Sequence, residues 1–213
     1  MAALAVTIAA YARAFAPDAV RMRRDLHRHP EVAWTERRTT YRIAEALSAD
    51  GLDPQVRADL VGLTVEVGSG MPVVGFRADI DALPIHEETG APYRSQIDGV
   101  MHACGHDGHT AIGLGVAEVL SALHHELNGT VKLIFQPAEE GAPPGEEGGA
   151  DLMLAEGLFD DPRPEAVFGL HTRPGIPAGK MGYAMGPALA AADSFELTIE
   201  GRQTHGASPH QGI

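Results

Sequence analysis

The feature that most constrains the fold of this chain is the alternation of short apolar runs with segments of helical pattern. The apolar, β-branched runs predict strands at residues 61–67, 73–77, 130–135 and 165–170. The helical periodicity and the start signals predict helices at residues 17–28, 35–49, 110–124 and 150–156. Strands that alternate with helices indicate a three-layer α/β/α sandwich around a mostly parallel mixed sheet. The first two strands are expected to pair with each other across a glycine-rich turn.

The charge and the cysteine content exclude several classes of protein. The 16 basic and 29 acidic side chains give a formal net charge of −13, which disfavours nucleic acid and anionic membranes as partners. Cys104 is the single cysteine, so an internal disulfide is excluded and a reducing compartment is favoured. Residues 1–17 predict an alanine-rich helix of a cytoplasmic protein, because no basic residue precedes the apolar run as in a signal peptide. No stretch reaches the roughly 20 apolar residues of a membrane span.

A glycine-bearing loop, Met101-His-Ala-Cys-Gly-His-Asp-Gly-His109, carries the cysteine among three histidines. A free cysteine is most often a small buried filler. Clustered imidazoles in one loop serve no packing purpose, however, and they favour metal ligation by Cys104 and His106. His102 and His109 are then supporting groups, substrate contacts or simple loop residues. A nucleophilic Cys104 activated by a histidine is the weaker alternative, since it leaves the nearby carboxylate pair without a task.

Two adjacent carboxylates, Glu139 and Glu140, follow the predicted strand at 130–135 and a proline. Such a pair is commonly a solvated turn, but this position directs it toward the carboxyl edge of the sheet, where ligands gather in α/β folds. Neighbouring side chains point different ways, so Glu140 can bind a metal while Glu139 takes a proton from water as a general base. His171 ends the strand at 165–170; alone it is more often a core histidine, but the converging motifs favour a ligand.

Asp79 and Asp81 close the predicted strand at 73–77. Carboxylates beside ligating histidines orient the ring and set its tautomer, and this role is expected for one of the two residues. The alternative is an ordinary Asx turn before Pro84.

The last segment of the chain differs from the rest. Residues 194–200 alternate between apolar and polar side chains, which predicts a half-exposed strand. Few residues follow it, too few to close a core of their own. We therefore expect residues 1–190 to form the N-terminal portion of one domain and residues 191–213 to begin a second, α+β domain.

These segments together resemble the amidohydrolase branch of the M20 metallopeptidase family, which includes aminoacylase-like enzymes, hippurate hydrolases and plant indole-acetyl-amino-acid hydrolases. The resemblance is carried in the family's order by RDLHRHPE (24–31), FRADIDALP (76–84), GVMHACGHDGHTA (99–111), FQPAEEG (135–141), GLHTRP (169–174) and GRQTHGASPHQG (201–212).

The resemblance implies a zinc-peptidase-like fold that binds two divalent ions and hydrolyses the amide bond of N-acyl amino acids or small peptides. Its ligand positions match Cys104, His106, Glu140 and His171, and its general base matches Glu139. His205 matches the histidine of the lid and dimerisation domain that stabilises the oxyanion. Thiolate, imidazole and carboxylate ligands suit Zn, Mn, Co or Ni.

The sequence covers the N-terminal half of the family pattern and ends within the lid and dimerisation domain. One further histidine ligand of the family has no counterpart in this sequence, and the full-length family form is expected to be a homodimer. The alternative to an active amidohydrolase is therefore a catalytically incomplete fragment that keeps the fold and partial metal binding without turnover.

Overall fold

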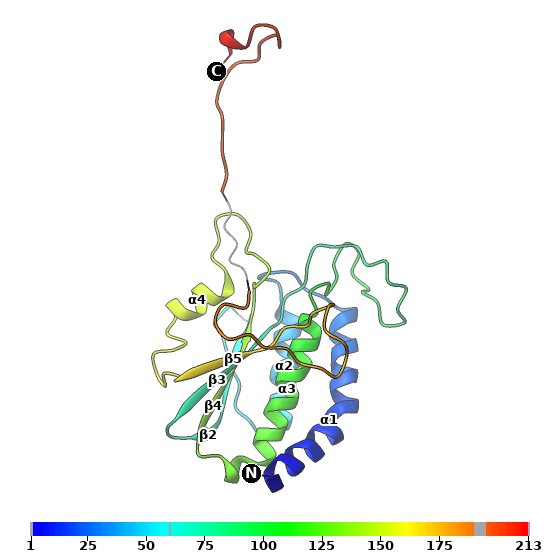
Figure 1. Cartoon of the computed structure of the whole chain (residues 1–213), viewed down its shortest axis with the longest axis vertical. Coiled ribbons are helices and arrows are strands. Elements are labelled where there is room, and N and C mark those ends of the chain that lie inside the picture. The colour runs from blue at the N-terminus through cyan, green and yellow to red at the C-terminus, as the bar shows by residue number, and fades with distance from the viewer. Residues whose placement is uncertain (1, 60, 190–194, 213) are drawn as a thin grey trace. The chain divides into compact units, whose positions relative to one another are not determined.

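The computed structural model describes residues 2–59, 61–189 and 195–212 of the chain (Figure 1). Two compact units divide after Thr172, the first formed by Met1–Thr172 and the second by Arg173–Ile213. The predicted domain boundary at residue 191 lies outside the described residues and stays a prediction.

A five-stranded mixed sheet in the order β1-β2-β4-β3-β5 forms the centre of the first unit. The strands are β1 (Gln55–Val56), β2 (Leu63–Ser69), β3 (Val73–Asp79), β4 (Gly129–Gln136) and β5 (Ala166–Gly169). β3 is parallel to β4 and to β5, whereas β2 is antiparallel to both of its neighbours. β2 is thus the one strand of opposite direction in the described sheet, and the predicted mixed α/β architecture is confirmed.

The predicted pairing of the first two apolar strands is wrong, because β4 lies between β2 and β3. β4 is buried along nearly its whole length, and it hydrogen-bonds on both sides, as a central strand does. The turn that joins β2 to β3 passes over the start of β4, where a Cβ on Gly129 would lie 2.2 Å from the carbonyl oxygen of Pro72. Two apolar runs with a short turn look the same in sequence whether they pair or flank a third strand.

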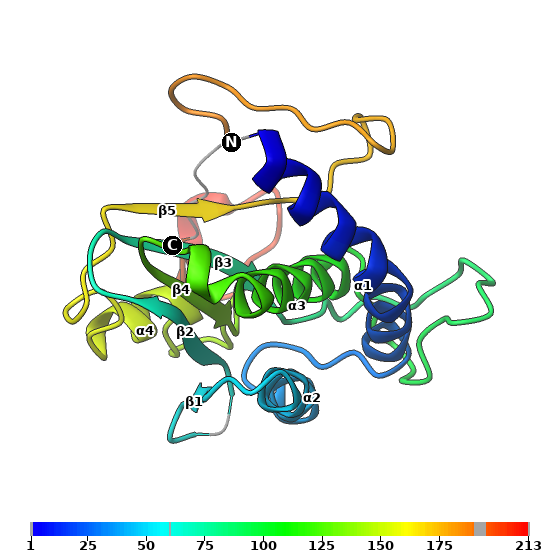
Figure 2. The same ribbon diagram turned by 90° about the horizontal axis from the view of Figure 1, so that it is seen from below.

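Helices cover both faces of the sheet (Figure 2). α1 (Ala2–Arg28), α2 (Arg37–Ala49) and α3 (His106–Ala122) lie on one face, and the short α4 (Gly149–Ala155) lies on the other. The main core fills the space between α2, α3 and the sheet. Its buried side chains are Ile43, Leu47, Leu63, Val65, Val67, Ala78, Ile80, Leu114, Ala117, Leu133 and Phe135.

α1 is a single helix, so the predicted helix start at Pro17 is wrong. Pro17 is exposed, and water can therefore hydrogen-bond to the carbonyl group that loses its helical partner there. Residues 3–28 are long and apolar enough to cross a membrane by length and composition, with a mean hydropathy of 1.2 in one window. Signal sequences and the core helices of soluble proteins share these properties, and the predicted cytoplasmic location stays a prediction.

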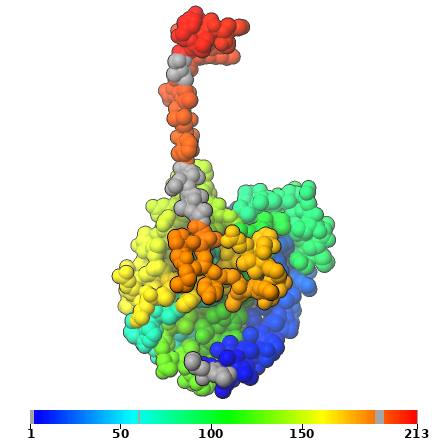
Figure 3. All heavy atoms as spheres, viewed as in Figure 1, coloured from blue at the N-terminus to red at the C-terminus, as the bar shows by residue number. Residues whose placement is uncertain are grey.

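α3 begins at His106, whereas the sequence predicts a loop that ends at His109 and a helix that begins at Thr110. The glycines and histidines of this segment carry little helical signal of their own. Their side chains are instead held by carboxylates at the end of β3, a contact that local sequence does not reveal. The loop at 84–100 that precedes this segment projects from the first unit beside the C-terminal end of α1 (Figure 3), and Gln96 N–H donates there to the Arg28 carbonyl.

The described part of the second unit is exposed chain with one 3-10 turn, η2 (Pro209–Gln211). The predicted strand at 194–200 is wrong for residues 195–200, which have no strand pairing among the described residues, and Ser194 lies outside them. Alternation predicts a strand only when a neighbouring strand is available to hydrogen-bond with it.

Candidate metal centre

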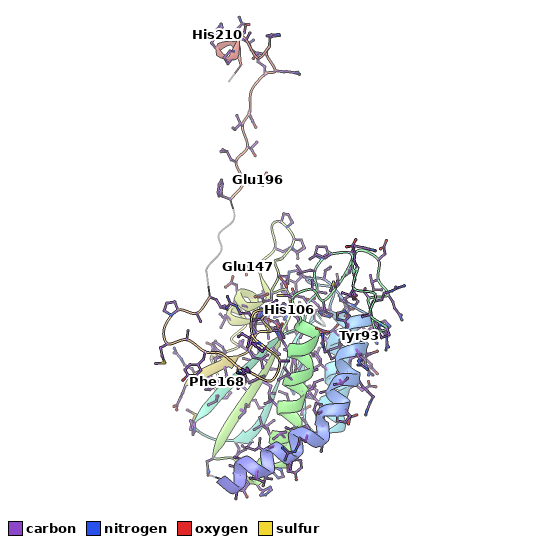
Figure 4. All side chains as sticks on the ribbon, turned by 45° about the vertical axis from the view of Figure 1, so that its right-hand side comes forward. Tyr93, His106, Glu147, Phe168, Glu196 and His210 are labelled. Carbon is purple, nitrogen blue, oxygen red and sulfur yellow. The ribbon has the colours of Figure 1, made fainter. Side chains whose placement is uncertain are left out.

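The sheet brings the predicted site residues to one edge. β3, β4 and β5 are mutually parallel, so their carboxyl ends meet there: Asp79 ends β3, the Glu139-Glu140 pair follows β4, and His171 follows β5. His106 joins them from the first turn of α3, at the end of the sheet near the loop that carries Glu147 (Figure 4). This convergence is the arrangement that parallel α/β sheets use for ligands.

Cys104, His106 and His171 form one group of potential ligands. One donor atom from each residue lies within 4.8 Å of the others, and Cys104 Sγ is 3.3 Å from His171 Nε2. His106 Nδ1–H donates to Asp81 at 3.1 Å, which leaves Nε2 as the free donor atom of this ring. His106 is fully buried, and its Nε2 has no hydrogen-bond partner in the described part of the chain.

The carboxylate pair lies across from His106 Nε2. Glu140 Oε1 is 3.5 Å from this nitrogen, and Glu139 Oε2 is 3.7 Å from it. Glu140 Oε1 is itself buried without a hydrogen-bond partner among the described residues. Burial and the nearby Asp79 carboxylate raise the pKa of Glu139 above its ordinary value. A raised pKa suits a group that accepts and returns a proton near neutral pH.

Asp81 and Asp79 hold the surrounding groups, and both are buried. Asp81 accepts the His106 ring proton with one oxygen and the Glu140 backbone N–H with the other, at 2.9 Å. Asp79 accepts from His109 Nδ1–H and from Arg77 Nη1–H, each at 2.6 Å. Burial alone raises the pKa of Asp79, but the His109 hydrogen bond and the neighbouring positive charges outweigh it, so the pKa lies below its ordinary value.

Glu36 is a further residue of the site that the sequence does not predict. This carboxyl is fully buried behind the Glu139-Glu140 loop, and its Oε1 accepts the Ala138 backbone N–H at 2.8 Å. Ala138 has a φ of 47°, a left-handed conformation that is unfavourable for alanine, and the hydrogen bond stabilises it. Burial raises the pKa of Glu36 to about 7. In the sequence, Glu36 is a polar residue before a helix, and nothing there indicates a contact with a loop a hundred residues later.

The remaining predicted residues lie in different places. His109 is fully buried and contacts Asp79 and Thr172. His102 lies in a separate buried group beside His27, with 6.4 Å between ring centroids, and burial lowers its pKa to about 4. His205 belongs to the second unit, where its ring accepts the Ala207 N–H, and its predicted role stays a prediction.

The donor set fits a divalent cation. Burial and the Glu140 carboxylate raise the pKa of the Cys104 thiol to about 12, so the thiolate is unfavourable here unless a cation offsets the negative charge. Donor atoms bound to one tetrahedral ion at roughly 2.0–2.3 Å lie roughly 3.3–3.8 Å apart. The Cys104–His171 and His106–Glu140 separations of 3.3 and 3.5 Å have that spacing.

Known proteins are similar to this chain in sequence and fold. The sequence profile described as "Peptidase family M20/M25/M40" matches residues 75–211. An N-acetylcysteine deacetylase of Bacillus subtilis is 41% identical over an alignment of 205 residues that covers 94% of this chain and 52% of that protein. An N-acyl-L-amino acid amidohydrolase of Geobacillus stearothermophilus is 40% identical over 198 residues, 92% of this chain and 52% of that protein.

A solved structure is also similar to this chain. The YXEP protein of Bacillus subtilis, described as a dinuclear metal binding peptidase from the M20 family, superposes with a TM-score of 0.71 at 43% identity. The superposition covers 78% of this chain and 46% of that protein. The chain thus spans about half the length of the curated relatives that it matches.

Proposed function

The chain belongs to peptidase family M20/M25/M40, and from that membership we propose that it is a metal-dependent amidohydrolase of N-acyl amino acids. The observation that carries the proposal is that the buried His106 Nε2, which has no hydrogen-bond partner among the described residues, lies 3.7 Å from Glu139 Oε2 and 3.5 Å from Glu140 Oε1 at one edge of the sheet. The substrate class is supported by the names of two relatives, an N-acetylcysteine deacetylase and an N-acyl-L-amino acid amidohydrolase.

In this proposal, Cys104, His106, Glu140 and His171 hold divalent ions, and their mixed ligand set suits Zn, Mn, Co or Ni. A second ion is supported by the dinuclear description of the YXEP protein. When bound, such ions supply polarisation of the amide carbonyl and a more acidic water. Residues of the chain orient the ligands: Asp81 accepts hydrogen bonds from the His106 ring and from the Glu140 backbone N–H, and it thereby fixes both.

Glu139 is the general base in this proposal. Its carboxylate is about one-third exposed and lies 3.7 Å from His106 Nε2, so it faces the ligand group while remaining open to water. It takes a proton from the attacking water and returns it to the leaving amine. Arg77, whose Nη2 is 3.9 Å from Glu139 Oε1, limits the rise of the Glu139 pKa and keeps the carboxylate available.

Hydrolysis of an N-acetyl amino acid by the full chain, with added Mn²⁺ or Zn²⁺, tests the proposal. Glu139→Gln removes the base and should lower the rate by about 10²–10⁴-fold. The control is Glu147→Gln, because Glu147 is exposed at the same end of the sheet and forms no hydrogen bond or ion pair with the ligand residues in the described part of the chain, so the rate should be unchanged.

Other outcomes separate the competing interpretations. Equal rates for the Glu139→Gln variant and the unaltered chain contradict the base assignment. Metal binding without turnover under any metal supports the catalytically incomplete fragment. Turnover that survives chelation but is lost on alkylation of Cys104 supports the nucleophilic cysteine instead.

We further propose a cytoplasmic location and a homodimeric full-length form, with His205 as the oxyanion-stabilising group.

A further inference from the structure

Thr172 joins three segments of the site through three hydrogen bonds. Its backbone N–H donates to His109 Nε2 at 2.8 Å, and its hydroxyl donates to the Cys104 carbonyl at 2.9 Å. Its own carbonyl accepts His171 Nδ1–H at 2.6 Å. One residue therefore connects the end of β5, the loop before α3, and α3 itself.

The anchor on α3 is the buried ring of His109. His109 is fully buried, and because its Nε2 accepts the Thr172 N–H, its Nδ1 carries the ring proton. That proton is donated to Asp79 at the end of β3, at 2.6 Å. Both ring nitrogens of His109 are thus occupied, which removes it from the set of free metal donors and makes it a link from β3 to Thr172.

The contact with the Cys104 loop is close. A Cβ at position 105 would lie 2.5 Å from Thr172 Oγ1, and Gly105 has a φ of +91°, so both space and backbone conformation favour glycine. The Thr172 hydroxyl therefore packs directly against the peptide between Cys104 and His106.

From these contacts we infer that Thr172 is a positioning residue that sets His171 against Cys104, with His109 as its anchor. The His171 Nδ1–H bond to the Thr172 carbonyl leaves Nε2 unprotonated, 3.3 Å from Cys104 Sγ. The hydroxyl of the same residue holds the backbone of Cys104. This inference rests on the proposed metal centre, because both positioned residues are ligands in it.

Co²⁺ binding by the full chain tests the inference without relying on turnover, because a Co²⁺–thiolate bond gives a charge-transfer absorption. Thr172→Val keeps the shape and both backbone hydrogen bonds but removes the hydroxyl, and it should weaken Co²⁺ binding by about tenfold, the low end for a group that orients ligands. Thr172→Ser retains the hydroxyl and should bind as the unaltered chain does.

Two histidine variants test the anchor. His109→Gln can place its amide oxygen where Nε2 lies and still accept the Thr172 N–H, whereas the shorter His109→Asn reaches only the Nδ1 position. Hydrogen exchange in the metal-free chain should show the Thr172 amide protected in the unaltered chain and in His109→Gln, and faster in His109→Asn. Co²⁺ affinity should follow the same order.

The outcomes are separable. An unaltered chain without the thiolate absorption contradicts the proposed metal centre. Normal absorption with equal affinities for Thr172→Val, Thr172→Ser and the unaltered chain contradicts the positioning role alone. The positioning role is also contradicted if metal-free Thr172→Val is less thermally stable than the unaltered chain but binds Co²⁺ equally well. In that case the Thr172 hydroxyl contributes to folding alone.

Discussion

At the scale of single residues, buried carboxyl groups hold the site in place. Asp81 fixes a ring and a backbone amide, Asp79 fixes His109, and Glu36 fixes the backbone of Ala138 just before the Glu139-Glu140 pair. Such groups stabilise a precise geometry only while each buried oxygen has a partner. Glu36 is the exception, because its Oε2 has no hydrogen-bond partner in the part of the chain that is described.

Glu36 should therefore make stability depend on pH. Its pKa rises from 4.5 to about 7 on folding, mainly through burial. The folded state retains the proton at a pH where the unfolded state has lost it, so this contribution to stability is complete below pH 4.5 and is lost as the pH rises to about 7. The loss amounts to about 3 kcal/mol at 1.36 kcal/mol for each pKa unit.

The isosteric Glu36→Gln variant cannot ionise and tests this expectation. Its free energy of unfolding, measured by chemical denaturation at several pH values, should change less between pH 4.5 and 7 than that of the unaltered chain. Parallel pH profiles for the two proteins contradict the assignment to Glu36.

The residue types at the site were predictable from sequence because they lie in short motifs beside strand ends. Cys104 and His106 stand out by their place in a histidine cluster, and the Glu139-Glu140 pair stands out by its place after a predicted strand and a proline. Glu36 and Thr172 do not, because their roles arise from hydrogen bonds to loops that are distant in sequence. The division between Asp79 and Asp81 was equally undetermined in the sequence, and the structure gives each carboxylate a different histidine.

At the scale of elements, the packing of α3 on the sheet positions His106. Gly113 faces β4 in this packing, and a Cβ there would lie 2.9 Å from Phe135 Cε1 and 3.3 Å from Ala78 Cβ. Phe135 is fully buried and belongs to the main core, so it has little room to move. The close approach of helix and strand thus depends on the missing side chain at this position.

Gly113→Ala should therefore destabilise the chain by about 1–3 kcal/mol through overpacking, although alanine is the better helix former. The matched control is Gly108→Ala on the same helix, whose Cβ would meet no atom nearer than 4.0 Å and should gain up to about 1 kcal/mol from helix propensity. Urea unfolding midpoints measure both changes. Equal shifts for the two variants contradict this packing.

Element positions were largely predictable, whereas the order of the strands was not. The predicted ranges for β4 and β5 differ from the structure by only a few residues, because apolar runs between turn signals are local. The insertion of β4 between β2 and β3 depends on parallel pairing across more than fifty residues, and no local pattern encodes it. The early start of α3 has the same cause, since its first turn is held by β3.

At the scale of the whole molecule, the chain carries a formal charge of −13, and several of its carboxylates converge with a thiol and imidazoles at one sheet edge. Bound divalent cations would offset part of this charge. The chain spans about half the length of the curated relatives that it matches, so the proposed function depends first on whether this chain itself binds metal.

X-ray absorption at the zinc edge of the zinc-loaded full chain measures that capacity most directly. We predict bound zinc with a sulfur neighbour at about 2.3 Å and nitrogen or oxygen neighbours at about 2.0–2.2 Å. Cys104→Ser should remove the sulfur neighbour and keep the others. A chain that retains no zinc, or one whose zinc has only nitrogen and oxygen neighbours, would contradict the proposed centre.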